Sequence, residues 1–160
     1  MTQKNNIATT VAKKTATKKI TRKKFVPGDF GLKVKRSTAG LGLFAGTAIP
    51  KGACVIEYVG RTLEPGEDLT SNSLYLFEIT KTKTIDGTAR TNTARYINHS
   101  CKPNCEIEYN KGRVFIFALR NIKPGEELNY DYEEEYFNEY IKPKGCRCRK
   151  CSPQLYAEAK

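Results

Sequence analysis

The sequence predicts a mainly β domain built from small sheets, and three observations support this prediction. Short stretches in which apolar and polar residues alternate recur along the chain, separated by glycine- and proline-containing turns. Long apolar runs are absent, and the longest, VFIFAL at 114–119, has the length of a buried strand. With 160 residues, 39% of them hydrophobic, the chain fits one domain with a modest core and a tail.

The elements follow from these alternating stretches and their turns. A glycine-rich turn is expected in AGLGLFAG at 39–46, and a Pro-Lys-Gly turn at 50–52. EEEYFNEYI at 133–141 predicts a short helix that ends before Pro143. We expect strands, in chain order, over residues 31–37, 53–60, 74–79, 84–88, 113–122 and 127–132.

Positive charge is concentrated at the N-terminus. Residues 1–24 contain eight Lys and Arg and no acidic residue, so the net charge of +11 leaves only +3 for residues 25–160. KKTATKKITRKK has no apolar periodicity, which predicts a disordered tail. Such a tail either keeps the protein in solution or contacts a nucleic acid or an acidic partner through its charge.

The sequence predicts an intracellular protein that does not enter a membrane. No apolar stretch reaches the roughly 18–20 residues that a spanning helix needs, and the N-terminus has no apolar block of a secretory signal. Thiols stay reduced in the cytosol and nucleus. We therefore expect the six cysteines to be metal ligands or free thiols.

Three of these cysteines lie within six residues, in GCRCRKC at 145–151. Cys146, Cys148 and Cys151 can provide three of the four ligands of a tetrahedral zinc site, and a tail of free thiols is the simpler alternative. The basic residues between them would offset the charge of four thiolates. Spacing leaves the fourth ligand open among Cys54, His99, Cys101 and Cys105.

Several unusual motifs occur in one order along the chain. The Gly-x-Gly of the first, taken alone, indicates no more than a tight turn. The motifs are AGLGLF at 39–44, IEYVG at 56–60, YLF at 75–77, ARYINHSCKPNC at 94–105, ALRNIKPGEELNYDY at 118–132 and GCRCRKC at 145–151. Together they resemble the SET-domain protein lysine methyltransferases with a post-SET cysteine cluster, over residues 31 to 151.

The resemblance implies a β-clip fold of small curled sheets, with short helices and a post-SET zinc loop. In this fold the segment after Asn98 and His99 is threaded by the chain near Tyr132, a knot-like crossing that is rare in proteins. The implied organisation is a disordered basic tail over 1–27, a SET domain over 28–137 and a post-SET segment over 138–160.

The resemblance also implies two bound groups, S-adenosylmethionine and a structural zinc ion. Cys101 would complete the zinc site with Cys146, Cys148 and Cys151, leaving Cys54 and Cys105 as buried free thiols. Only two residues separate Cys148 from Cys151, where relatives have four, so the loop must be tighter. Implied contacts to S-adenosylmethionine are Gly40, Leu41, Gly42, Tyr75, Arg95, Asn98 and His99.

Three tyrosines match the family's reaction site. Tyr132 matches the catalytic tyrosine, and Tyr75 would help to wall the channel of the target lysine. Burial of that lysine beside a cationic methyl donor would lower its pKa and make it nucleophilic. Tyr130 corresponds to the phenylalanine/tyrosine switch, which implies monomethylation or dimethylation rather than trimethylation.

Compact proteins of this kind resemble the stand-alone SET proteins of bacteria and large viruses. We expect a histone or histone-like substrate, no membrane, DNA contact through the basic tail, and a location in nuclear chromatin or in a bacterial cytoplasm with delivery to a host nucleus. Self-methylation within KKTATKK at 13–19 is a further hypothesis. The alternative class is a basic, nucleic-acid-associated zinc module of chromatin that catalyses no reaction.

Overall fold

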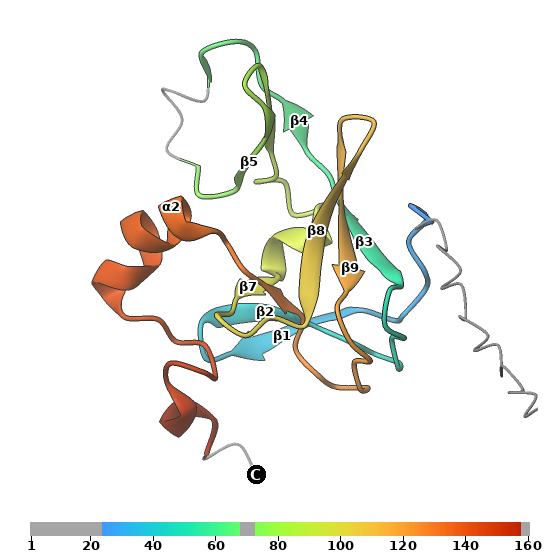
Figure 1. Cartoon of the computed structure of the whole chain (residues 1–160), viewed down its shortest axis with the longest axis vertical. Helices are drawn as coiled ribbons and strands as arrows, with labels where there is room; N and C mark the ends of the chain where they lie inside the picture. Colours follow the sequence, from blue (N-terminus) through green and yellow to red (C-terminus); the bar gives the residue numbers. More distant parts are fainter. Residues whose placement is uncertain (1–23, 68–72, 158–160) are drawn as a thin grey trace, which may run out of the picture.

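The computed structural model describes residues 24–67 and 73–157, and in this part of the chain it confirms the mainly β prediction. Ten strands form four small sheets, in the orders β1-β2, β7-β10, β3-β9-β8 and β4-β6-β5 (Figure 1). Their bounds are β1 Lys33–Ser37, β2 Gly40–Phe44, β3 Cys54–Tyr58, β4 Arg61–Thr62, β5 Leu76–Thr80, β6 Lys83–Asp86, β7 Asn98–His99, β8 Cys105–Asn110, β9 Arg113–Ala118 and β10 Asn129–Tyr130.

The helices are short. A 3₁₀ helix over Thr93–Tyr96 precedes β7, and α2, Glu134–Tyr136, continues into a π-helical turn over Phe137–Ile141. This confirms the helix expected at 133–141. Further 3₁₀ turns at Lys142–Lys144 and Pro153–Tyr156 flank the C-terminal cysteines. None of the helices in the described residues is long and apolar enough to cross a membrane.

Four strands lie outside the expected ranges: β2, β8 and the two-residue strands β4 and β7. GLGLF, predicted as a glycine-rich turn, is strand β2, and it pairs antiparallel with β1 from Ser37–Gly40 to Lys33–Phe44. The reversal of the chain is made by Thr38 and Ala39 alone. Strand β8, which was not expected, pairs with β9 along its whole length.

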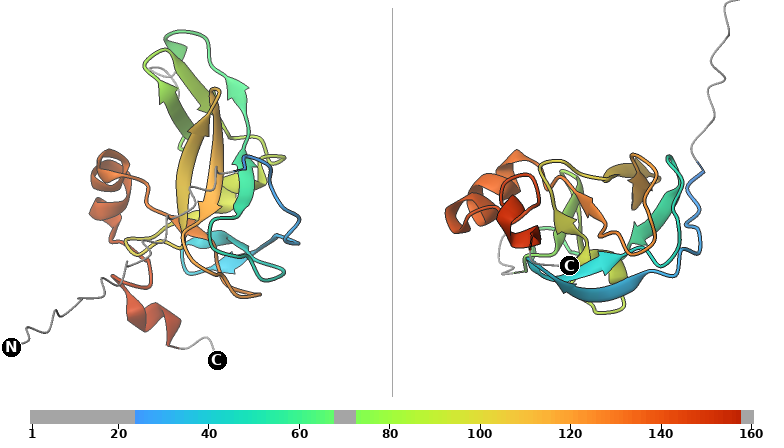
Figure 2. Two further views of the ribbon diagram at one scale, coloured as in Figure 1. Left: turned by 45° about the vertical axis from the view of Figure 1, so that its right-hand side comes forward. Right: turned by 90° about the horizontal axis from the view of Figure 1, so that it is seen from below.

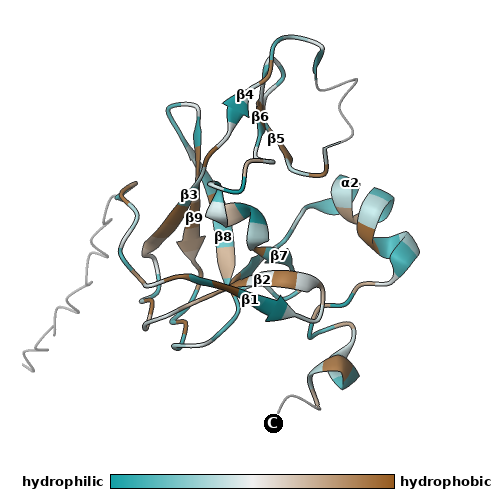
Figure 3. Ribbon diagram, turned by 180° about the vertical axis from the view of Figure 1, so that it is seen from behind, coloured by the Kyte–Doolittle hydropathy of each residue, from teal (hydrophilic) through white to brown (hydrophobic). Residues whose placement is uncertain are grey.

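The core lies between the sheets, around Leu43, Val114, Ile116 and Leu128, all fully buried. Strand β9 is buried on both faces because its other side chains, Phe115 and Phe117, form a second cluster. Apolar residues accordingly gather on β3 and β9 (Figure 3).

A segment before β1 covers this second cluster. The Phe25 ring lies edge-on to the rings of Phe115 and Phe117, with centroids 5.3 Å apart in each pair. The packed part of the chain therefore begins before residue 28. Residues 1–23, which hold most of the predicted tail, lie outside the described residues.

The expected crossing of two sequence-distant segments is present. Strand β10 pairs parallel with β7, with Asn129 opposite Asn98 and Tyr130 opposite His99. The buried side chain of Asn104 joins the same two segments: its Oδ1 accepts the Asn129 N–H at 2.9 Å, and its Nδ2 donates to the Glu127 carbonyl at 2.8 Å. Residues 98–104 and 127–130 are thereby held side by side.

The C-terminal segment lies on one flank of this crossing. Helix α2 and the turns that follow lie beside β7 and β10. The β4-β6-β5 sheet forms one end of the molecule, and β1 and β2 lie toward the other end (Figures 1 and 2). Strand β5, the crossing and the C-terminal segment therefore border a common region.

Candidate active site and metal centre

An aromatic cavity of about 770 Å³ opens between β5, the crossing and α2. Its rings come from Tyr58, Tyr75, Phe77, Tyr96, Tyr109, Tyr130, Tyr132, Tyr136 and Tyr140. Its charged lining is acidic apart from Arg95, and consists of Glu78, Glu133, Glu135 and Glu139. Such a lining suits a cation on an apolar stem, because aromatic faces and carboxylates both attract positive charge.

A second cavity, of about 840 Å³, lies between the β1–β2 turn, the crossing and the C-terminal cysteine loop. Six basic residues line it: Arg36, Lys102, Arg120, Lys144, Arg147 and Arg149. Its acidic residues are Glu126, which is paired with Arg120, and Glu127. We call this the cationic cavity.

The two cavities share a wall. The residues that line both are Ala39, Leu74, Asn98, Tyr132, Tyr136 and Tyr140. Groups bound in the two cavities can therefore meet beside Tyr132 and Asn98. The opposite charges of the linings favour two different ligands.

Residues of the crossing fix Tyr132 both at its side-chain hydroxyl and at its backbone. Its hydroxyl donates a hydrogen bond of 2.6 Å to the Ile97 carbonyl, and its backbone N–H donates to His99 Nδ1 at 3.2 Å. The ring packs against Tyr130, Tyr136 and His99. Burial raises the pKa of Tyr132 above its ordinary value, so the hydroxyl is neutral at physiological pH.

His99 links Tyr132 to the cysteine cluster. Because Nδ1 accepts a backbone N–H, the proton of the neutral ring lies on Nε2, which contacts Cys101 Sγ at 3.2 Å. Burial lowers the pKa of His99, partly offset by Asp131, and so favours this neutral form. The imidazole thus donates toward a sulfur on one side and holds the Tyr132 backbone on the other.

Tyr75 and Arg95 form a second fixed group on the aromatic cavity. The Arg95 guanidinium stacks on the Tyr75 ring, 3.9 Å from its centroid, and donates to the Thr88 carbonyl. The Tyr75 carbonyl accepts the Tyr58 hydroxyl at 2.9 Å. Arg95 Nε is buried and has no partner among the described residues. These contacts hold Tyr75 rigidly in the cavity wall.

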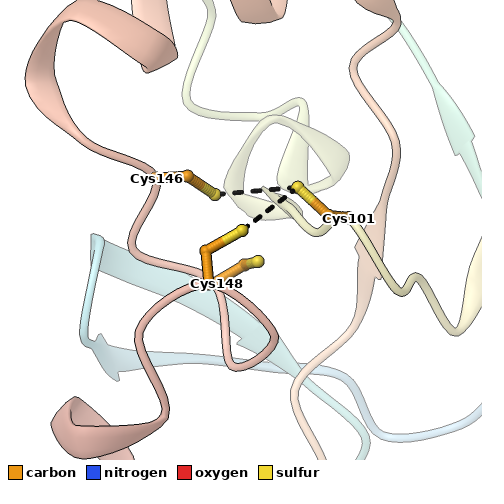
Figure 4. Close-up of side chains that lie close together, drawn as sticks. Cys101, Cys146 and Cys148 are labelled. Atoms are coloured by element: carbon orange, nitrogen blue, oxygen red, sulfur yellow. Dashed lines mark hydrogen bonds between the residues drawn. The ribbon is translucent and has the colours of Figure 1, made fainter.

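Four cysteines form a potential metal centre. The sulfur atoms of Cys101, Cys146, Cys148 and Cys151 all lie within 4.8 Å of one another, and those of the first three face a common point (Figure 4). Cys101 Sγ is 3.9 Å from Cys146 Sγ and 3.6 Å from Cys151 Sγ. Zinc–sulfur bonds of about 2.3 Å place tetrahedral sulfurs about 3.8 Å apart, so the cluster fits a zinc ion.

The environment favours a thiolate at Cys148, whereas burial raises the pKa of Cys146 to about 11 and also raises that of Cys101. Burial alone would raise the pKa of Cys148, but backbone N–H groups of Cys101, Cys151 and Lys150 lower it to about 6. The loop is tied to the β1–β2 turn, because the Thr38 hydroxyl donates to the Tyr156 hydroxyl at 2.7 Å and that hydroxyl donates to the Arg147 carbonyl. The tighter spacing of the cysteines is therefore compatible with four ligands.

Among the four candidates for the fourth ligand, Cys101 is the one whose sulfur lies with those of the C-terminal cysteines, and its role as a ligand stays a prediction. Cys54 and Cys105 are buried free thiols in other parts of the fold, and burial raises the pKa of Cys54 to about 11 and that of Cys105 to about 12. Chain spacing could not make this choice, since Cys101 reaches the cluster only through the crossing.

The residues predicted to contact S-adenosylmethionine are divided between the cavities. Asn98 lines both cavities, His99 lines the cationic one, and Leu41, Tyr75 and Arg95 line the aromatic one. Gly40 and Gly42 lie in β2 beside the shared wall and are among the lining residues of neither cavity. Their roles as contacts stay predictions.

Sequence reasoning missed part of the site. Tyr136 and Tyr140 extend the ring ladder from Tyr132, with centroid distances of 5.2 and 4.7 Å, and Tyr136 donates to the Leu74 carbonyl at 3.3 Å. The four-residue spacing of these tyrosines in the predicted helix was the available signal. Glu127 lies in the motif at 118–132, but nothing in the sequence indicated its bond with Asn98.

The fold and the site define a class: small β proteins in which a crossing of two segments separates an aromatic cavity from a second cavity beside a four-cysteine cluster. The family model "SET domain" matches residues 40–133, more than half of the chain. The chain belongs to the SET-domain family.

Curated relatives are named as histone-lysine methyltransferases. The chain is 37% identical over 125 residues to histone-lysine N-methyltransferase trr of Drosophila melanogaster, covering 70% of this chain and 5% of that protein. It is 34% identical over 140 residues to histone-lysine N-methyltransferase ASHR3 of Arabidopsis thaliana, covering 79% of this chain and 28% of that protein. The chain thus spans a small part of these relatives.

A solved structure shares the fold. It is that of KRYPTONITE in complex with mCHH DNA, an H3(1-15) peptide and SAH. The sequence identity is 35% and the TM-score 0.56, over 66% of this chain and 24% of that one.

Proposed function

We propose that this chain is a protein-lysine N-methyltransferase that acts on a histone or histone-like basic protein. The observation that carries the proposal is the wall between two cavities of opposite charge, at which Tyr132 and Asn98 are fixed. Relatives named as histone-lysine methyltransferases support the same reaction class.

The methyl donor is proposed to occupy the cationic cavity. This cavity has the size of an ordinary cofactor site and is lined by Asn98 and His99. Asn98 Oδ1 accepts no hydrogen bond from the described residues, so an acceptor is free for a ligand. The SAH in the solved relative supports S-adenosylmethionine, which supplies an activated methyl group when bound.

The target lysine is proposed to enter the aromatic cavity. Tyr75, Tyr130 and Tyr132 would surround its methylene stem, and the acidic residues at the lining would attract a basic peptide. Removal of the amine from water and the positive charge of the methyl donor beside it lower the pKa of the amine against the opposing effect of the acidic lining, and so favour its nucleophilic, neutral form.

Tyr132 acts on the reacting groups as a neutral hydroxyl. Since its proton is donated to the Ile97 carbonyl, its oxygen lone pairs remain available for C–H···O contacts to a methyl group in transfer. Fixed geometry contributes much of the rate of such an in-line displacement. Tyr130, 8% exposed, limits the space beside the amine, and we propose monomethylation or dimethylation.

The proposed metal is a structural zinc held by Cys101, Cys146, Cys148 and Cys151. A site with four thiolate ligands has no open position for a substrate. Its contribution is to hold the C-terminal loop against the cationic cavity and, through His99, against the Tyr132 backbone.

A nucleic-acid-associated zinc module is the second candidate function. Exposed basic residues of β1 and the C-terminal loop around the cationic cavity favour it, as does the basic sequence of residues 1–24. Both proposals include contact with DNA and a location in chromatin. The protein would be in the nucleus, or it would be made in a bacterial cytoplasm and delivered to a host nucleus. Methyl transfer is the property that separates the two.

The test is mass spectrometry after incubation of the full chain with S-adenosylmethionine and mixed core histones. We expect lysine peptides to gain whole methyl groups, and the gain to disappear with Tyr132→Phe. If S-adenosylmethionine binds neither to the protein alone nor to its mixture with histones, and the protein binds DNA in a salt-sensitive way, the nucleic-acid-associated zinc module replaces the methyltransferase as the proposed function.

A further inference from the structure

The side-chain amide of Asn98 is held in one orientation by two acceptors. Nδ2 donates to the Leu41 carbonyl at 3.0 Å and to Glu127 Oε1 at 2.8 Å. Both N–H groups of the amide are therefore used, one by the β2 backbone and one by a carboxylate from the residues before β10. A rotation of the amide by 180° would place Oδ1 against two oxygen atoms, which repel it.

This orientation leaves the oxygen of Asn98 as the atom offered to a ligand. Oδ1 has no hydrogen-bond partner among the described residues, and it is not one of their buried, unpaired polar atoms. Because Asn98 lines both cavities, Oδ1 is an accessible acceptor in the shared wall. It fits an N–H donor, such as an ammonium or amine group.

Glu127 is suited to impose this orientation because an ionised carboxylate only accepts hydrogen bonds. A glutamine or asparagine in its place could present either end to Asn98. The bond from Asn98 to a charged acceptor is also stronger than one between two neutral groups.

Gly42 provides the space in which Glu127 reaches Asn98. A Cβ at position 42 would overlap with Glu127 Oε1, and would lie 3.0 Å from Ser37 Cβ. The backbone of Gly42 has no positive φ, so any L-residue could adopt its conformation. Gly40 differs, because its φ of 116° favours glycine although the surrounding space is open. Glycine is therefore needed at position 42 because a side chain there would occupy the space of the Glu127 carboxylate.

We propose that Glu127 and Gly42 are positioning residues that fix Asn98 as an acceptor toward the ligands of the methyl-transfer site. The proposal rests on the proposed function for the identity of those ligands. The donor that Asn98 meets is the ammonium of the S-adenosylmethionine amino-acid part or the amine of the target lysine, which share the same chemistry.

The first experiment measures binding of S-adenosylhomocysteine to the full chain by calorimetry. Glu127→Ala should weaken binding about tenfold, as expected for loss of one charge-assisted bond. Glu127→Gln should show a smaller loss, since its amide can still accept from Asn98. Glu64→Ala, which removes an exposed carboxylate outside both cavities, should leave the affinity within about twofold of wild type.

A second ligand identifies the donor. 5′-Methylthioadenosine lacks the ammonium group but keeps the thioadenosine part. If Asn98 meets the cofactor ammonium, Glu127→Ala weakens S-adenosylhomocysteine alone. If it meets the lysine amine, both affinities are unchanged and the KM for a lysine peptide rises about tenfold instead. Unchanged values for all three ligands overturn the proposal.

Gly42→Ala separates positioning from a general structural role. It should weaken ligand binding as much as Glu127→Ala, because the new Cβ displaces the carboxylate. In the Glu127→Ala background the same substitution should cost little further affinity, since the carboxylate that the new Cβ would displace is gone. Additive losses would show that Gly42 acts independently of Glu127 and contradict the proposal.

The side-chain ¹⁵NH₂ resonances of Asn98 report the orientation without any ligand. We expect both protons to be protected from exchange in wild type and one to lose protection in Glu127→Ala. If wild type binds no S-adenosylhomocysteine, the proposed function fails, and these resonances still decide the positioning proposal. Resonances that do not change in Glu127→Ala overturn it.

Discussion

Replacement of Asn104 by alanine tests whether the crossing holds the site together. Asn104 is 1% exposed, and its side chain bonds the Asn129 N–H and the Glu127 carbonyl. Asn104→Ala leaves the N–H without a partner and the carbonyl with only a weaker bond from the Asn129 side chain at 3.3 Å. At about 1–3 kcal/mol for each unsatisfied buried group, the free energy of unfolding should fall by about 2–4 kcal/mol.

The assay is thermal and urea unfolding beside a matched control. A loss of 2–4 kcal/mol corresponds to a fall in Tm of about 8–16 °C for a domain of this size. Asn121→Ala removes one exposed bond, to the Lys51 N–H, and should cost about 0.5 kcal/mol. Methyl transfer at a temperature where Asn104→Ala stays folded should also fall, because the crossing positions Tyr132. Equal stabilities of the two variants would show that the Asn104 side chain does not hold the crossing together.

Three further predictions concern the site. Tyr130→Phe should raise the number of methyl groups added to one lysine, and an unchanged count in peptide mass spectra would argue against a role of the Tyr130 hydroxyl. We expect the wild-type chain to hold one zinc ion, Cys148→Ser to lose it and to have a lower Tm, and Cys54→Ala to keep it. Equal metal content in the two variants would exclude the four-cysteine site. Since burial raises the pKa of Tyr132, the rate should increase with pH as the lysine deprotonates, without a fall up to pH about 10; a fall at lower pH would show that ionisation of Tyr132 limits the reaction.

The strands could be predicted where local pattern and environment agree. The alternation in the stretches around β1, β3, β5 and β6 placed these strands to within a few residues, and the apolar run of β9 correctly indicated a buried strand. Strand β8 carries the same signal, since Cys105, Ile107 and Tyr109 alternate with polar residues.

The glycine stretch shows the limit of local rules. Two glycines within three residues predict a turn, yet Gly40–Phe44 forms β2 because its pairing with β1 and the burial of Leu43 outweigh the low strand propensity of glycine. Gly42 is explained by Glu127, a residue 85 positions away in the chain. The residues around Gly42 in the sequence do not indicate that contact.

The candidate site was accessible from sequence only through its motifs. Tyr132, Asn98 and the C-terminal cysteines were predicted, and the structure brings them together at the crossing. The division into two cavities was not predictable, because it depends on how the residues after β10 fold back over β5. The same holds for the bond from Asn98 to Glu127.

The most direct test of the proposed function is a crystal structure of the full chain with S-adenosylhomocysteine and a lysine peptide. We expect the nucleoside in the cationic cavity beside Asn98 and His99, the lysine side chain in the aromatic cavity, and its amine facing the sulfur beside Tyr132. Both ligands in one cavity, or the nucleoside in the aromatic cavity, would contradict the proposal that methyl donor and lysine approach the shared wall from opposite sides.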